Sequence, residues 1–285
     1  MVSTAVKKPV KKGDTRKRDV HEATSRWPVT VAAVLAVLAV LLALFLVLRR
    51  HQNDVVSFQG SPTQVVVQSS AGLVIVVPSD GNQVQVSRRA TWTLFKPDMS
   101  VGVEGGSLVV KADCYGPSLI CDVQYRVSVP SDVSVRVVGG GGDVQIDGIG
   151  GKVDVQTSSG DVALTNLASD IKVRTTSGDV SLASMAGTLD LATDSGAITG
   201  SSITSPAIQT GTSSGDTSLN VTGSADRIGS GSSSGDITLV VPDLAYQVDA
   251  KSASGDAQVD VNQSADASRT ITATTGSGEI SITRG

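Results

Sequence analysis

Residues 158–180 read SSGDVALTNLASDIKVRTTSGDV and contain one full unit of a repeat. Val162 and Leu164 alternate with polar neighbours, and so do Ile171 and Val173. Because successive side chains of a strand point to opposite faces, this alternation predicts two short strands, each with one buried face. The Ser-Gly-Asp triplets on either side mark the turns between units.

The corner glycine of this unit occurs eight times in all between residues 142 and 278. The intervals between successive corner glycines are 18, 18, 18, 19, 20, 20 and 23 residues. One strand pair cannot bury its apolar face alone, whereas stacked units each cover the next, so a near-constant period predicts a solenoid. The predicted corner glycines are Gly142, Gly160, Gly178, Gly196, Gly215, Gly235, Gly255 and Gly278.

The predicted fold is all-β, with a parallel β-helix or solenoid over residues 139–285. Equivalent strands of neighbouring coils would pair in parallel at about 4.8 Å. Right-handed winding is favoured because parallel crossovers nearly always have that hand. The left-handed hexapeptide helix is rejected because the apolar spacing within a unit is irregular. Residues 60–138 contain strand patterns at uneven spacing and are expected to form an N-terminal β cap, whereas no equivalent C-terminal cap is expected.

Two roles are open for the polar residues of the corners. Glycine is expected to adopt positive φ there, and the neighbouring Ser and Asp side chains are expected to bond the N–H groups of the turn. Stacked carboxylates are also the ligands that Ca²⁺ prefers, so a Ca²⁺ column is the weaker alternative, and no metal site is predicted. The acidic column comprises Asp143, Asp161, Asp179, Asp216, Asp236, Asp256 and Glu279, with a gap at Ala197.

Residues 28–48, PVTVAAVLAVLAVLLALFLVL, carry no charge. A helix of this length spans about 30 Å, the thickness of a bilayer core, so the segment is predicted to cross a membrane once. A buried core helix is disfavoured because no other helical segment could surround it. A cleaved signal peptide remains an alternative, although its apolar region is usually shorter and ends in small residues.

Charge around the apolar segment predicts its direction. Eight Lys or Arg residues precede it and only Arg49 and Arg50 closely follow it. The positive-inside rule places residues 1–27 in the cytoplasm as a disordered basic tail. Residues 49–59 would then be a juxtamembrane linker, and the C-terminal domain would lie outside the cell membrane.

Composition excludes several classes of function. The first fifty residues have a net charge of +7 and the remainder −11, and an acidic body argues against nucleic acid as a partner. His21 and His51 are the only histidines, so the repeats cannot hold a histidine-dependent nucleophile or zinc site. Aromatic residues make up 3% of the chain, which disfavours a polysaccharide-cleaving site. No cofactor is predicted.

The only two cysteines are Cys114 and Cys121. If the body of the protein lies outside the cell, its compartment permits oxidation, and a structural disulfide is predicted. A metal pair would lack further ligands, and a redox pair usually has the tighter Cys-x-x-Cys spacing.

The strand Tyr125–Pro130 ending in Val-Pro, the following Gly142-Asp143-Val144 and the repeated Ser-Gly-Asp-Val/Ile resemble a bacterial domain family of unknown function labelled "putative adhesin". The resemblance covers roughly residues 60–283. It implies a β-solenoid with a role at the cell surface, and it implies no particular activity. Members of this family also look like partners of envelope-stress signalling.

Two non-enzymatic functions are therefore weighed. In the first, a single membrane anchor displays a stiff solenoid that contacts an envelope component or a protein partner. In the second, the solenoid senses envelope damage and the basic tail passes the signal inward. A polysaccharide-active enzyme is a third, weaker alternative.

Overall fold

The computed structural model describes residues 27–60, 62–116 and 120–285. The chain divides into two compact units, residues 1–46 and residues 47–285. The first contains the helix α1 (Trp27–Leu48), and the expected basic tail 1–27 lies almost wholly outside the described residues. Within the described chain this is the one helix long and apolar enough to cross a membrane, with a mean hydropathy of 3.3 over Val31–Leu48. It fits a signal anchor or a single span, and its bounds agree with the predicted 28–48.

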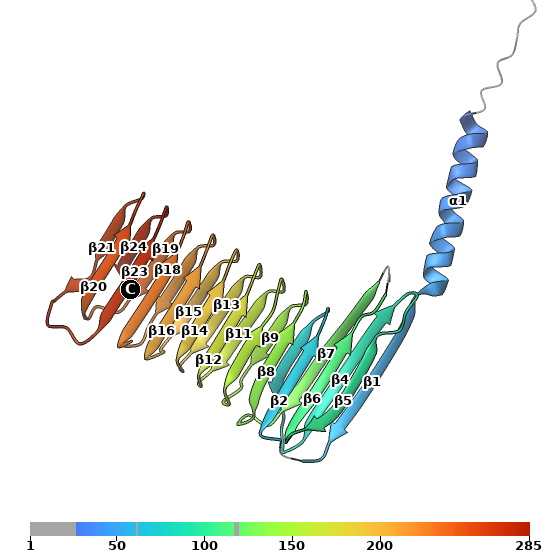
Figure 1. Cartoon of the computed structure of the whole chain (residues 1–285), viewed down its shortest axis with the longest axis horizontal. Coiled ribbons are helices and arrows are strands. Elements are labelled where there is room, and N and C mark those ends of the chain that lie inside the picture. The colour runs from blue at the N-terminus through green and yellow to red at the C-terminus, as the bar shows by residue number, and fades with distance from the viewer. Residues whose placement is uncertain (1–26, 61, 117–119) are drawn as a thin grey trace, which may run out of the picture. The chain divides into compact units, whose positions relative to one another are not determined.

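The second unit consists of two long sheets that face each other across an apolar core (Figure 1). We call them sheet A and sheet B. Sheet A contains, in spatial order, β1 (Arg50–Phe58), β4 (Val84–Trp92), β7 (Cys121–Val129), β3 (Val74–Pro78), β9 (Val144–Asp147), β11 (Val162–Leu167), β13 (Val180–Met185), β15 (Ile198–Ile203), β17 (Thr217–Val221), β19 (Ile237–Val241), β24 (Ile280–Arg284) and β21 (Ala257–Asp260).

Sheet B runs alongside sheet A and supplies the other strand of each coil. It contains, in spatial order, β5 (Asp98–Glu104), β6 (Ser107–Asp113), β2 (Gln64–Ser69), β8 (Ser134–Gly139), β10 (Val153–Gln156), β12 (Ile171–Thr175), β14 (Leu189–Thr193), β16 (Ala207–Thr212), β18 (Arg227–Ser232), β23 (Thr270–Thr275), β20 (Ala245–Ser252) and β22 (Asn262–Gln263).

Each coil has a strand in sheet B, a corner, and a strand in sheet A. Val162 pairs with Val144 on one side and with Val180 on the other, in parallel and in register. Corresponding residues of successive coils therefore stack in rows, which is the arrangement that the 18-residue period predicts. The predicted parallel β-solenoid is confirmed, while its right-handed winding stays a prediction.

The core of the middle coils is made of Val, Leu and Ile side chains. Val162, Leu164, Ile171 and Val173 are each at most 2% exposed. Among the described residues the fully buried aromatic side chains are Tyr125 and Tyr246, and each lies in the outermost complete coil at its end of the stack. Small aliphatic side chains thus fill a narrow interior, and the larger tyrosines fill its ends.

The order of coils departs from the order of the sequence at both ends. The coil formed by β23 and β24 lies between β18/β19 and β20/β21, so the last strands of the sequence are inside the stack (Figure 1). At the other end, β2 and β3 lie inside β6 and β7. The last strands of the sequence therefore do not form the open coil, which is formed by β20 and β21.

The N-terminal region continues the stack of the two sheets. Strands β4 and β1 add to sheet A in antiparallel fashion, and β5 adds to sheet B in the same way. Residues 49–59, expected to be a linker, are mostly strand β1, because its backbone pairs with β4 from Arg50 to Phe58. The expected boundary between 60–138 and 139–285 falls within one continuous stack.

Candidate interaction surface

The eight predicted corner glycines lie in one row along the solenoid, joined by Gly72. A Cβ atom built on Gly178 would lie nearer than 3.0 Å to the carbonyl of Gly160, and one on Gly160 would meet the carbonyl of Gly142 in the same way. None of the eight has positive φ, so the expected conformational reason is wrong. Glycine is required because the neighbouring coil's backbone occupies the space of a side chain.

A second row of side chains holds the corners together. The Gly196 N–H donates to the hydroxyl of Thr193 at 3.0 Å, and that hydroxyl donates to the carbonyl of Gly178 in the neighbouring coil. The Ser and Asp beside each glycine were expected to bond the N–H groups of the turn, and the hydroxyl residue three positions before the glycine was not predicted. The same position is occupied by Thr175, Thr212, Ser232, Ser252 and Thr275, and each accepts the N–H of its corner glycine.

The acidic column caps backbone groups between coils rather than within one turn. The Asp161 carboxylate accepts the N–H of Asp179 at 3.0 Å, and the Asp179 carboxylate accepts the N–H of Ala197 at 2.8 Å. Asp143, Asp216 and Asp236 make the corresponding bond to the next coil. Asp256 lies on the terminal coil, where no further coil supplies an N–H.

This geometry bears on the Ca²⁺ alternative. One oxygen of each of these five carboxylates already faces a backbone N–H, and the described residues include no group of three His, Cys, Asp or Glu placed to hold an ion. We therefore expect the same melting temperature in millimolar Ca²⁺ and in chelator, measured by circular dichroism. A rise with Ca²⁺ that disappears in Asp179→Asn would restore the ion column.

Ala197 interrupts the acidic column and leaves the N–H of Asp216 without a carboxylate. We expect Ala197→Asp to stabilise the fold by about 0.5–1 kcal/mol, because a charge-assisted hydrogen bond outweighs repulsion from the carboxylates of Asp179 and Asp216. Urea unfolding at low and high salt measures the change. The gain should increase with salt, since salt screens the repulsion. A loss of stability at both salt concentrations would contradict the capping role.

The two outer faces of the solenoid differ in charge. On sheet B, ion pairs cross between neighbouring strands, with Arg174 to Asp190 at 2.6 Å and Arg136 to Asp154 at 3.4 Å. On sheet A, the outward side chains from β11 to β19 carry no charge. They are Ala163, Thr165, Ser181, Ala183, Thr199, Ser201, Ser218, Asn220, Thr238 and Val240.

A shallow hollow adjoins this uncharged face. It has a volume of about 410 Å³ and crosses β3, β9 and β11, with Arg126 and Asp147 at its polar side. The hollow adds one acidic and one basic group to an otherwise neutral array.

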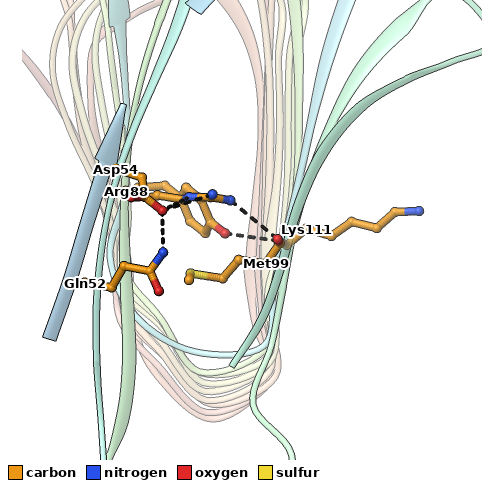
Figure 2. Close-up of polar contacts among 6 residues, drawn as sticks. Gln52, Asp54, Arg88, Met99 and Lys111 are labelled. Carbon is orange, nitrogen blue, oxygen red and sulfur yellow. Dashed lines mark hydrogen bonds and ion pairs between the residues drawn. The ribbon is translucent and has the colours of Figure 1, made fainter. Parts of the chain in front are cut away.

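The N-terminal end of the stack contains a polar cluster that no sequence pattern predicted (Figure 2). Arg88 on β4 reaches Asp54 on β1 at 3.1 Å, and Gln52 donates to the same carboxylate oxygen at 2.6 Å. Arg88 also donates to the carbonyl of Met99 on β5, so it joins sheet A to sheet B. Asp54 and Arg88 are 34 residues apart in the sequence, and no local pattern connects them. The cluster closes this end of the core.

The disulfide between Cys114 and Cys121 is present and closes the corner between β6 and β7. Nearby, the buried hydroxyl of Tyr125 on β7 donates to the carbonyl of Lys111 on β6 at 3.0 Å. Burial raises the pKa of Tyr125 to about 12, while Arg88 lowers it and Asp113 raises it. The neutral phenol thus joins the two sheets of the outermost complete coil.

We expect Tyr125→Phe to destabilise the protein by about 1–2 kcal/mol at neutral pH, because the carbonyl of Lys111 loses its donor. The pKa of Tyr125 is higher in the folded than in the unfolded chain. Its contribution is therefore fully present below about pH 10 and is lost as the pH rises through about 12. Urea unfolding from pH 8 to 12 should show a smaller alkaline decline in the variant, and an identical decline would contradict this assignment.

Comparison with known proteins agrees with this geometry. A family model described as Toastrack DUF4097 matches residues 46–284. No curated protein sequence matches the chain.

A solved structure with a TM-score of 0.50 shows a similar fold. A "putative adhesin" from Bacteroides fragilis is 14% identical, with a TM-score of 0.50, and the match covers 82% of this chain and 97% of that one. A "putative adhesin" from Parabacteroides distasonis is 9% identical, with a TM-score of 0.41 and the same two coverages. A "putative cell adhesion protein" from Clostridium sporogenes is 11% identical, with a TM-score of 0.32, covering 83% of this chain and 100% of that one.

Proposed function

This chain belongs to the Toastrack DUF4097 family, and from that premise we propose that it is a non-enzymatic adhesion module anchored to the cell membrane. The helix α1 is the single span, the basic tail is cytoplasmic, and the solenoid is displayed outside. Charge around the apolar segment supports this direction, and the disulfide suits an oxidising compartment.

The observation that carries the proposal is the uncharged outer face of sheet A. It presents hydroxyl and methyl groups in rows about 4.8 Å apart on a scaffold whose corners are hydrogen-bonded from coil to coil. Such a face can contact an extended partner over many coils without moving.

The pKa of Asp170 supports a non-enzymatic role. The Thr188 hydroxyl and Lys152 lower this pKa, and a lowered pKa suits a surface ion pair rather than a general acid.

The experiment compares full-length variants displayed on vesicles for their retention on cells of the source organism that lack this protein. We expect Thr199→Glu and Ser218→Glu to reduce retention about tenfold, because each places an unpaired charge in the contact face. Gln209→Glu, which adds the same charge on the outer face of sheet B, is the matched control. Equal retention of all three variants and the original chain would exclude sheet A as the contact surface.

The alternative function, envelope-stress signalling, rests on the eight basic residues that precede α1. Deleting residues 1–26 separates the two functions, provided that enough charge is restored to keep the orientation. Loss of a transcriptional response with normal surface display and retention would favour signalling. Unchanged transcription would leave adhesion as the function.

A further inference from the structure

The C-terminal end of the solenoid is an incomplete coil interior. Val248 and Val259 point into the core from β20 and β21, yet both are only half-buried because no further coil of the described chain covers them. Their counterparts one coil inward, Ile271 and Ile282, are completely buried. The loop after β22 covers Tyr246 and leaves the rest of this end open. Ala250 and Val261 are half-buried at the same end.

The backbone at this end has open hydrogen-bonding positions. The N–H of Gln247 donates to Arg269, on the side of β23. Since parallel strands point alternate residues to opposite sides, the N–H and C=O groups of Val248, Ala250 and Ser252 face outward. Strand β22 pairs only with Ala245 and Tyr246, so the edge from residue 248 onward is unpaired within the described chain.

The two ends of the stack are built differently. At the N-terminal end, Asp54 on the edge strand β1 points inward to Arg88, and an inward charge is a known means of blocking a sheet edge. The edge segment 248–252 of β20 has no proline and no inward charge. This edge therefore lacks the features that prevent pairing with another strand.

The charges on β20 indicate which strand would pair with this open edge. Asp249 and Lys251 flank Ala250 on the outer face, and both are more than half exposed. If β20 met its own copy in antiparallel fashion about Ala250, each Asp249 would lie opposite Lys251 of the second copy. The outward backbone groups of 248, 250 and 252 would then pair with 252, 250 and 248 of that copy, which is the register that antiparallel hydrogen bonding requires.

Antiparallel pairing of two copies about Ala250 implies a twofold axis, and the same axis is compatible with pairing of β21 in sheet A. The carbonyl of Asp256 accepts the N–H of Ile280, so the backbone groups of Ala257 and Val259 face the open edge. An axis at Val259 would place Gln258 opposite Asp260 of the second copy, with no like charges opposed. Both sheets would then continue across the junction, and the half-buried valines would become interior residues.

We propose that the C-terminal ends of two copies of this chain join by antiparallel pairing of β20 with β20 and of β21 with β21. This inference rests on the proposed membrane anchoring and goes beyond the proposed function, because it adds a contact with a second copy of this chain to the contact through sheet A. One residue separates α1 from strand β1, and β21 lies at the opposite end of the same sheet. Chains anchored in two facing membranes would thus meet through the ends farthest from their anchors in the stack.

The experiment uses full-length chains in two populations of vesicles and measures clustering by light scattering. The original chain should cluster its own vesicles. Asp249→Lys alone and Lys251→Asp alone should each reduce clustering about tenfold, because like charges then oppose across the junction. Mixing the Asp249→Lys and Lys251→Asp populations should restore clustering, since their charges are again complementary.

A cysteine variant gives an independent readout. Ala250→Cys should form an intermolecular disulfide under mild oxidation, whereas Thr199→Cys, exposed on the central strand β15, should not. Unchanged clustering of either charge variant, or failure of the mixed populations to recover, would overturn the pairing. Absence of clustering by the original chain would overturn the self-association. The cell-retention experiment tests adhesion through sheet A independently of this result.

Discussion

Gly178→Ala is expected to lower the free energy of unfolding by about 3–5 kcal/mol, a large effect for adding one methyl group. The new Cβ would lie nearer than 3.0 Å to both the carbonyl carbon and the carbonyl oxygen of Gly160. These are backbone atoms of the adjoining coil, which pairs with its neighbours on both sides and has no rotamer to change. The two coils can accommodate the methyl group only by separating.

Gly211→Ala is the matched control, because a Cβ there meets no atom within 4 Å and the backbone does not have positive φ. Its stability should change by less than about 1 kcal/mol, towards higher stability, since alanine reduces the freedom of the unfolded chain. Urea unfolding of both variants decides the matter. Similar small changes at both positions would mean that the corners tolerate side chains and that the glycine row has no role in stacking.

The repeat was sufficient to predict the coil, because its information is local. Alternation of Val162 with Leu164 and of Ile171 with Val173 determines which side chains turn inward, and the constant period determines the parallel register. The disulfide followed from the compartment and from the absence of other cysteines. The positions of the corner glycines were predicted correctly but for the wrong reason, because close contact with a neighbouring coil cannot be read from the sequence of one repeat.

Features that depend on contacts between distant segments could not be predicted. Arg88 and Asp54 carry no motif, and their pairing follows only from the addition of β1 and β4 to sheet A. A second row of turn residues was not predicted, although its members are equally spaced in the sequence. Gly148, Asn166, Ser184 and Ser202 recur every 18 residues with positive φ, and glycine and asparagine are the residues that favour it.

The stacking order at the C-terminal end was also beyond local reasoning. All coils carry the same pattern, so nothing within residues 257–260 or 280–284 states which neighbour each strand prefers. The 23-residue interval between Gly255 and Gly278 was the one available signal, because the longer connection lets the chain pass over the end and return one coil inward. A test of this order must distinguish positions that look equivalent in sequence.

Ile282→Ala and Val259→Ala provide that test. Ile282 lies between Leu239 and Val259 and is completely buried, so its truncation should lower the free energy of unfolding by about 3 kcal/mol or more. Val259 is half-exposed on the terminal coil, and its truncation should have an effect of about 1 kcal/mol or less. Stacking in sequence order would reverse the ranking, because Ile282 would then lie on the open end and Val259 inside. Urea unfolding of the full chain at a concentration low enough to keep it monomeric measures both values, and the sign of their difference decides between the two orders.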